Sequence, residues 1–137
     1  MTQEDKELLL QDLCARLPYG VICEDEYGNV LELNSIDKPN TVTFKCSDKI
    51  FWTTDLDKCK PYLFPLSSMT DEQIMQSPTS VHVCDLENLR YDSVWTELNS
   101  RFTDLIDLID WLNKNHFDYR GLIERGLAID ATNKNIY

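Results

Sequence analysis

Apolar residues change their spacing twice along this chain, and no other feature of the sequence limits its possible folds as strongly. Leu9 and Leu13 lie four residues apart before Pro18, whereas from Val21 onward apolar and polar residues nearly alternate. Helical spacing returns in residues 102–114. A period near 3.6 indicates an amphipathic helix, and a period of two indicates a half-buried strand. The sequence therefore predicts an α+β fold in which helical segments flank a short sheet.

The N-terminal helix is predicted to span residues 3–17. Thr2 and Asp5 have the spacing of a capping box, in which each side chain accepts a hydrogen bond from the backbone N–H of the other residue. Pro18 then stops the helix, because proline lacks the N–H that a helix interior needs. Asp12 is assigned to the solvent-facing side with the other polar residues of this segment.

Four short strands are predicted to follow. Residues 21–23 and 30–36 flank the polar segment 25–29, which contains a Gly-Asn turn and predicts a hairpin. Residues 41–46 alternate between apolar and polar side chains, and residues 50–53 add a fourth strand. Such strands form either an antiparallel β-meander or a bent small barrel. We expect this sheet to pack against the N-terminal helix and a C-terminal helical segment.

Residues 60–69 are predicted to form a buried connection without regular structure. They combine the large side chains of Tyr62 and Phe64 with Pro61 and Pro65. Proline extends neither a helix interior nor a central strand, because it cannot donate a backbone hydrogen bond.

Two further helices are predicted, with an ambiguous region between them. Thr70 and Gln73 have capping-box spacing, which predicts a short helix over residues 70–76. The second helix covers residues 102–114. Between them, residues 86–100 allow either a helix or a loop.

A brief strand is predicted at residues 80–84, where His82 and Cys84 share one face. A metal bound there would need two more ligands from elsewhere in the fold. The five cysteines of the chain are scattered and never form a Cys-x-x-Cys pair. We therefore expect neither a metal nor a cofactor.

The end of the chain is predicted to be less regular. Residues 117–125 fit a short helix that Gly126 closes as its C-terminal cap, with an extended segment after it. Residues 130–137 are expected to fray, because chain ends stay poorly ordered unless other contacts hold them. A length of 137 residues is common for one domain, so residues 1–137 are interpreted as a single domain.

The charge of the chain limits its partners. It carries 24 acidic and 13 basic residues, a formal net charge of −11. Neutralising nucleic-acid phosphates requires clustered Lys and Arg, and the sequence has no such cluster. No apolar run approaches the roughly 18 residues needed to cross a bilayer, and the first residues are polar and mostly acidic. We expect a cytoplasmic protein that binds neither nucleic acid nor membrane directly.

Three segments of the chain resemble a group of uncharacterised proteins that are common in gut bacteria and in their phages or other mobile elements. The segments are LCARLPYGV at residues 13–21, KPYLFPLSSMT at residues 60–70 and FDYRGLI at residues 117–123. The resemblance implies an intracellular protein encoded by a bacterium or by one of its phages or other mobile elements. It implies no assigned activity and no catalytic residue.

A polar cluster near the C-terminus is the part of the sequence most similar to an active site. His116, Asp118, Tyr119 and Arg120 bring a general base, a carboxylate, a phenol and a guanidinium within five residues. In the alternative interpretation, the aromatic residues anchor the chain after a helix, and Asp118 caps the next turn and pairs with Arg120. We favour this structural alternative, because the cluster contains neither a nucleophile nor a second carboxylate.

Acidic and aromatic residues offer two further surfaces. Asp104, Asp107 and Asp110 share one side of the 102–114 helix, where carboxylates can imitate the phosphates of a nucleic acid or serve only as a solvated face. The solvated face is the favoured interpretation. Four large aromatic residues are expected to lie in the core, although an exposed subset can form a peptide groove. These are Phe51, Trp52, Tyr62 and Phe64.

The sequence contains no catalytic motif and no basic patch. This pattern predicts a non-enzymatic accessory or protein-interaction domain whose partner is another protein. Two alternatives remain open. The first is an acidic inhibitor that blocks a nucleic-acid-binding enzyme of the host, and the second is a small enzyme that uses the His116 region.

Overall fold

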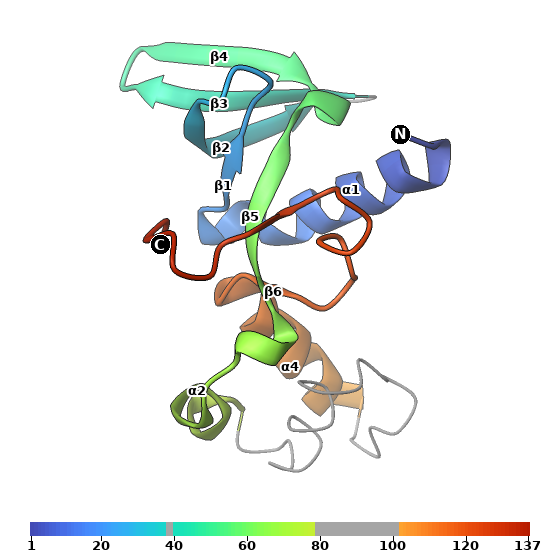
Figure 1. The fold of residues 1–137 in the computed structure, drawn as a ribbon, viewed down its shortest axis with the longest axis vertical. Helices are drawn as coiled ribbons and strands as arrows, with labels where there is room; N and C mark the ends of the chain where they lie inside the picture. Colours follow the sequence, from blue (N-terminus) through green and yellow to red (C-terminus); the bar gives the residue numbers. More distant parts are fainter. Residues whose placement is uncertain (38–39, 79–101) are drawn as a thin grey trace.

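The structure is a computed structural model that describes residues 1–37, 40–78 and 102–137 (Figure 1). The predictions for residues 80–84 and 86–100, His82 included, lie outside the described residues. The helices are α1 (Gln3–Arg16), α2 (Asp71–Gln76) and α4 (Phe102–Lys114). The strands are β1 (Ile22–Glu24), β2 (Val30–Asp37), β3 (Thr41–Ser47), β4 (Ile50–Asp55), β5 (Lys60–Pro65), β6 (Phe117–Asp118) and β7 (Ile129–Asp130).

The strands form one mixed sheet in the order β4-β3-β2-β1-β5-β6, and β7 also pairs with β5. Strands β1 to β4 are an antiparallel meander, and β5 runs antiparallel to β1. The short strands β6 and β7 lie parallel to β5. The predicted α+β fold with an antiparallel meander is confirmed. The small barrel is not formed, because β4 pairs with no strand other than β3 in the described chain.

Helix α1 begins where the sequence predicts and ends one residue earlier than predicted, at Arg16. The Thr2 hydroxyl accepts a hydrogen bond from the Asp5 N–H at 3.1 Å, and the Thr2 N–H donates to the Asp5 carboxylate at 3.2 Å. Leu9 and Leu13 are fully buried and pack against the meander. The helix therefore covers one face of the sheet, as Figure 1 shows.

The β1–β2 hairpin is fixed by Asp25. Its carboxylate accepts hydrogen bonds from the backbone N–H groups of Tyr27 and Asn29, both at 2.9 Å, and from the Asn29 side chain at 2.8 Å. Gly28 has a φ of 81°, a conformation that glycine adopts without steric cost. The turn lifts Tyr27 toward strand β4.

Strand β5 corrects the prediction of an irregular connection at residues 60–69. Pro61 and Pro65 lie near the two ends of the strand, so the residues between them keep their hydrogen-bonding groups. The Phe64 N–H donates to the His116 carbonyl at 2.8 Å, and the Leu63 carbonyl accepts from the Ala131 N–H at 2.8 Å. A central strand tolerates proline here because Pro61 is its second residue and Pro65 its last.

The C-terminal region also differs from the prediction. In place of a short helix after residue 117, strand β6 leads into a turn in which Leu127 N–H donates to the Leu122 carbonyl at 2.9 Å. Gly126 closes this turn with a φ of 72°. The segment expected to fray ends in Tyr137, whose hydroxyl donates to the Tyr62 carbonyl at 2.7 Å.

Candidate functional site

The His116 region lies where α4, β5 and the C-terminal tail meet. Helix α4 ends at Lys114, and His116 adopts a φ of 61°, which reverses the chain direction. Its carbonyl accepts the Phe64 N–H and thereby starts the pairing of β6 with β5. The local fold therefore places the imidazole in the interior.

His116 is only 8% exposed and stacks on the ring of Tyr137, with ring centroids 3.6 Å apart and planes 8° apart. Burial, with the positive charge of Arg16 as a second cause, lowers the pKa of His116 to about 4. Its Nδ1 atom has no hydrogen-bond partner among the described residues. The imidazole is neutral at pH 7 and lies under an aromatic ring, which is a poor position for a general base.

Asp118 caps the next turn, as the structural alternative predicts. Its two carboxylate oxygens accept the N–H groups of Leu122 and Ile123 at 3.0 and 2.9 Å. Both oxygens are thus committed to backbone donors. The carboxylate has a structural role.

The structural alternative also predicts that Asp118 pairs with Arg120, and this prediction is wrong. Arg120 forms its ion pair with Asp12. Arg120 Nε lies 3.6 Å from Asp12 Oδ1, and its guanidinium lies over the Tyr119 ring, 5.2 Å from the centroid. The Tyr119 hydroxyl donates to Asn113 Oδ1 at 2.9 Å. The structure therefore brings the four predicted residues into one region but uses them for packing and turn formation.

A buried ion pair that the sequence interpretation missed joins α1 to this region. Arg16 Nε donates to Asp12 Oδ2 at 2.8 Å and Nη2 donates to Oδ1 at 3.0 Å, with both side chains fully buried. Arg16 Nη2 also donates to the Phe117 carbonyl at 2.7 Å. Burial raises the pKa of Asp12 while Arg16 opposes this effect. The spacing of four residues between opposite charges was the available signal.

The prediction that Asp12 lies on the solvent-facing side of the first helix is therefore wrong, because its side chain is fully buried. Strand β6 lies against this part of α1, and Arg16 donates a hydrogen bond to the Phe117 carbonyl of that strand. If the ion pair faced solvent, water would accept this hydrogen bond.

In the described residues, no group of three His, Cys, Asp or Glu side chains is arranged to hold a metal ion.

Two of the three aspartates predicted on one side of α4 have described side chains. Asp107 and Asp110 are exposed, whereas Leu108 and Leu112 are fully buried. The side chain of Asp104 lies outside the described part of the chain. Exposed carboxylates fit both a solvated face and a contact surface, so the interaction surface at Asp104, Asp107 and Asp110 stays a prediction.

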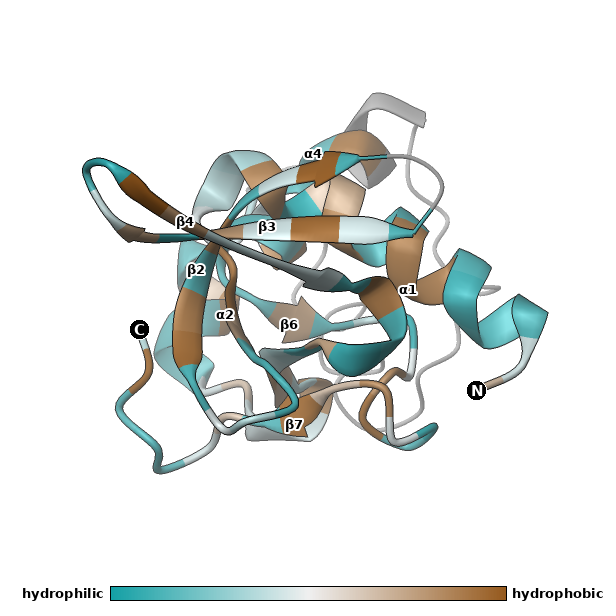
Figure 2. Ribbon diagram, turned by 90° about the horizontal axis from the view of Figure 1, so that it is seen from above, coloured by the Kyte–Doolittle hydropathy of each residue, from teal (hydrophilic) through white to brown (hydrophobic). Residues whose placement is uncertain are grey.

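Strand β4 carries the largest exposed apolar side chains of the sheet. Ile50 is 62% exposed, Phe51 51% and Trp52 42%. Tyr27, itself 69% exposed, contacts Trp52 edge-on with ring centroids 6.1 Å apart. The prediction that Phe51 and Trp52 lie in the core is wrong, because β4 is the outermost strand and extends away from the rest of the molecule (Figures 1 and 2).

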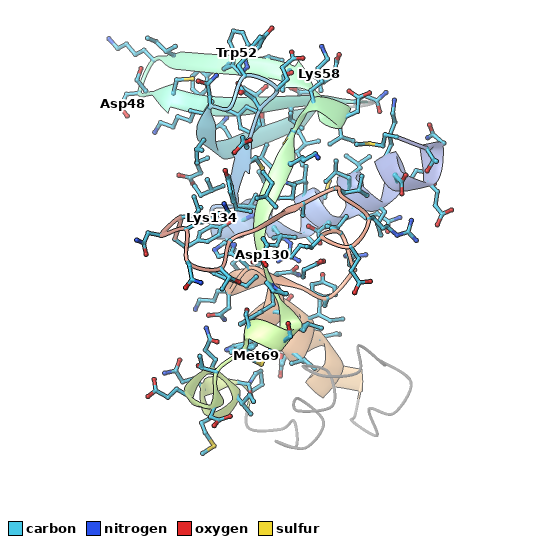
Figure 3. The ribbon with its side chains drawn as sticks, viewed as in Figure 1. Asp48, Trp52, Lys58, Met69, Asp130 and Lys134 are labelled. Carbon is cyan, nitrogen blue, oxygen red and sulfur yellow. The ribbon has the colours of Figure 1, made fainter. Side chains whose placement is uncertain are left out.

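The two aromatic residues of β4 project from opposite faces of the sheet. Trp52 pairs with Phe44 of β3 and shares its face, and Phe51 pairs with Lys45 on the other. Figure 3 shows Trp52 on the outermost strand, with Asp48 at the turn of the β3–β4 hairpin. By contrast, Tyr62 of β5 is buried, as predicted.

The free backbone groups of β4 can be assigned from one hydrogen bond. The Leu56 N–H donates to the Asn40 carbonyl at 2.6 Å, which makes this pair the hydrogen-bonded type. Antiparallel pairs alternate between the hydrogen-bonded and the non-hydrogen-bonded type. The N–H and C=O groups of Phe51, Thr53 and Asp55 therefore point away from β3, toward the open edge.

A shallow cavity of about 410 Å³ lies between the β1–β2 turn and β5. Several of its charged side chains already have partners, since Lys58 pairs with Glu26 at 3.2 Å and Asp57 pairs with Lys6, outside the cavity, at 3.3 Å. Glu24 accepts a hydrogen bond from the Tyr62 hydroxyl, and this bond raises the pKa of Tyr62 to about 12. The open edge of β4 is a better defined candidate site than this cavity.

None of the helices in the described ranges is both long and apolar enough to cross a membrane. Comparison with family models, with curated proteins and with solved structures yields no match to this chain.

Proposed function

We propose that this chain is a non-enzymatic protein-interaction domain that binds an extended polypeptide segment along the open edge of β4. The observation that carries the proposal joins two features of β4. The backbone groups of Phe51, Thr53 and Asp55 point to an edge that no described strand pairs with, and the side chains of Ile50 and Trp52 are exposed. An unpaired edge of this kind accepts another strand by main-chain hydrogen bonds, and pockets for alternate side chains add specificity.

Natural sheets avoid such an edge unless something covers it. They shorten it, place proline or lysine on it, or twist it away with a bulge. Strand β4 is six residues long and contains neither proline nor lysine. The register shift in its pairing with β3 lies between Lys45 and Ser47, so the ladder from Phe51 to Asp55 is regular. Large apolar side chains on this edge support a binding role, because exposed apolar patches mark interaction sites in soluble proteins.

The geometry of the His116 region supports a non-enzymatic role. The buried imidazole stacks on Tyr137, and both oxygens of Asp118 are bound to backbone N–H groups. A catalytic group must reach a substrate, and these groups are held by the fold. The small-enzyme alternative has the weaker support.

A second candidate function is the acidic inhibitor, which the exposed carboxylates of Asp107 and Asp110 and the net charge of −11 support. Such an inhibitor would bind a basic partner and lose it as salt rises. The β4 edge is preferred because its backbone and side chains specify a mode of binding, whereas an acidic helix face is common on soluble proteins. A cytoplasmic location and a phage or mobile-element origin belong to the same proposal.

The substitution Thr53→Pro tests the proposal. The Thr53 N–H points to the open edge, so proline removes a donor for a partner strand and leaves the backbone bonds to β3 in place. The hydroxyl contact between Thr53 and Thr43, at 3.3 Å, is lost in the proline variant and in any alanine variant alike. The matched control Thr53→Ala keeps the N–H. Linear peptides selected from a random phage-displayed library on the unmodified chain serve as probes.

The expected result is that Thr53→Pro weakens binding of the selected peptides at least about tenfold while Thr53→Ala changes it little. Circular dichroism and urea unfolding confirm that both variants fold. Equal peptide binding by a folded Thr53→Pro variant would contradict pairing along β4.

A further inference from the structure

We propose that the segment that pairs with β4 is the β4 strand of a second copy of this chain, so that two meanders join into one continuous antiparallel sheet. This inference rests on the proposed function and names the occupant of the same edge. It follows from the order of residues along β4, which complements itself when the strand is reversed.

Symmetry limits how two copies of this edge can meet. Two antiparallel edge strands are related by a two-fold axis normal to the sheet, so paired residues must project from the same face. The N–H and C=O groups of two paired residues must also both point toward the other strand or both point away from it. Since Phe51, Thr53 and Asp55 point outward, each of them pairs with an odd-numbered residue of the second copy.

One of the allowed registers places complementary residues opposite each other along the whole strand. When the axis passes through Trp52, Phe51 faces Thr53 of the second copy and Ile50 faces its Thr54. Lys49, in the turn that precedes β4, then faces Asp55 of the second copy. The pairing forms two Lys–Asp contacts, one at each end, and places the two Trp52 rings side by side on one face.

The neighbouring registers are less favourable. With the axis through Thr53, Phe51 faces the Asp55 carboxylate and Lys49 has no partner within β4. With the axis through Phe51, only residues 50–52 pair within the strand, because β4 begins at Ile50. Charge complementarity and ladder length therefore select the register centred on Trp52.

The side chains at this centre are already partly ordered in the single chain. Tyr27 packs edge-on against Trp52, so the pairing gathers four aromatic rings across the axis. Aromatic pairs at non-hydrogen-bonded positions stabilise antiparallel ladders. Because a six-residue edge buries less than the roughly 1,200–2,000 Å² of a standard interface, a dissociation constant in the micromolar range is expected.

Charge reversal tests the inference. Lys49→Glu alone places a new carboxylate opposite that of Asp55, and Asp55→Lys alone places two ammonium groups opposite each other, so either variant should weaken the dimer about tenfold. In an equimolar mixture, one Lys49→Glu chain and one Asp55→Lys chain pair with opposite charges at both ends. The mixture should recover the affinity of the unmodified chain.

The controls separate local pairing from overall charge. Lys49→Glu changes the net charge from −11 to −13 (−11 − 2), and Asp55→Lys changes it to −9 (−11 + 2). Long-range repulsion alone would weaken one dimer and strengthen the other, whereas local pairing weakens both. Lys134→Glu and Glu124→Lys make the same charge changes at exposed positions outside the β3–β4 hairpin and should leave the affinity within about twofold.

The measurement is sedimentation equilibrium from about 10 to about 500 µM, which brackets a micromolar dissociation constant. The inference is overturned if the unmodified chain stays monomeric, or if the mixture is as weak as the single variants. In another outcome, the chain is monomeric, binds phage-selected peptides, and loses that binding in the Thr53→Pro variant. This outcome would contradict pairing with a second copy and would support peptide binding at the β4 edge. If neither a dimer nor peptide binding is found, both proposals fail.

Discussion

Phe44 and Trp52 lie directly opposite each other on β3 and β4, yet Phe44 is fully buried and Trp52 is 42% exposed. Both residues project from the face that α1 covers, but the packed interior reaches β3 and not the outermost strand. The boundary of the core therefore passes between two paired aromatic residues. The proposed binding edge begins where this core ends.

This boundary predicts unequal effects of two substitutions. Phe44→Ala should cost about 3–5 kcal/mol of unfolding free energy, because it leaves a cavity in the core. Trp52→Ser should cost less, about 2 kcal/mol, since only about half of the Trp52 side chain is buried and its loss leaves no enclosed cavity. Urea unfolding at a protein concentration that favours monomer compares the two. Similar losses for both variants would place β4 inside the core.

The buried Asp12–Arg16 pair predicts a large effect when one partner alone is removed. Asp12→Leu should destabilise the chain by about 3–5 kcal/mol, because it leaves the Arg16 guanidinium buried without its carboxylate. The double variant Asp12→Leu with Arg16→Met should recover much of this loss, since an apolar pair carries no desolvation cost. Chemical unfolding measures both. A single variant as stable as the double would show that the pair is open to solvent.

The environment of His116 predicts a stability change in mildly acidic solution. Its folded pKa of about 4 lies below the unfolded value of 6.5, so the unfolded chain binds more protons between these values. The free energy of unfolding should therefore fall as pH drops from about 6.5 to about 4, by up to about 3 kcal/mol from this residue.

The comparison variant for His116 is His116→Asn, because asparagine tolerates the positive φ of 61° at this position. Unfolding free energies measured across this pH range should fall more steeply for the unmodified chain than for the variant. Parallel pH profiles would mean that the imidazole is solvated in the folded state.

The hydrogen bonds of Tyr137 predict that its side chain stabilises the fold. Its hydroxyl donates to the Tyr62 carbonyl at 2.7 Å and accepts the Ile22 N–H at 3.2 Å, which connects β5 to β1. Tyr137→Phe keeps the stacking on His116 and removes both bonds, so a loss of about 1–2 kcal/mol is expected. Thermal unfolding measures this loss. An unchanged melting temperature would indicate that the C-terminus is free in solution.

Elements that depend on local signals could be predicted from the sequence. The capping boxes at Thr2 and Thr70 start α1 and α2 as expected, and the Asp25 turn forms the expected hairpin. The helical period of residues 102–114 also predicts α4 correctly. These features arise from contacts within a few residues, which a sequence displays directly.

The remaining features depend on contacts between distant segments. Asp12 is buried only because β6, more than a hundred residues later, brings the Phe117 carbonyl to Arg16. Strand β5 is recognisable only once β1, β6 and β7 supply its partners, since its prolines favour an irregular segment. Trp52 is exposed because the order of strands places β4 at the edge, and periodicity does not reveal that order.

Hydrogen exchange at individual amides tests the role of the β4 edge most directly. At low protein concentration the N–H groups of Phe51 and Thr53 should exchange quickly, while those of Trp52 and Thr54, which face β3, should be protected. When the concentration rises or a selected peptide is added, protection should appear at Phe51 and Thr53. Fast exchange of these two amides under both conditions would contradict strand pairing at this edge.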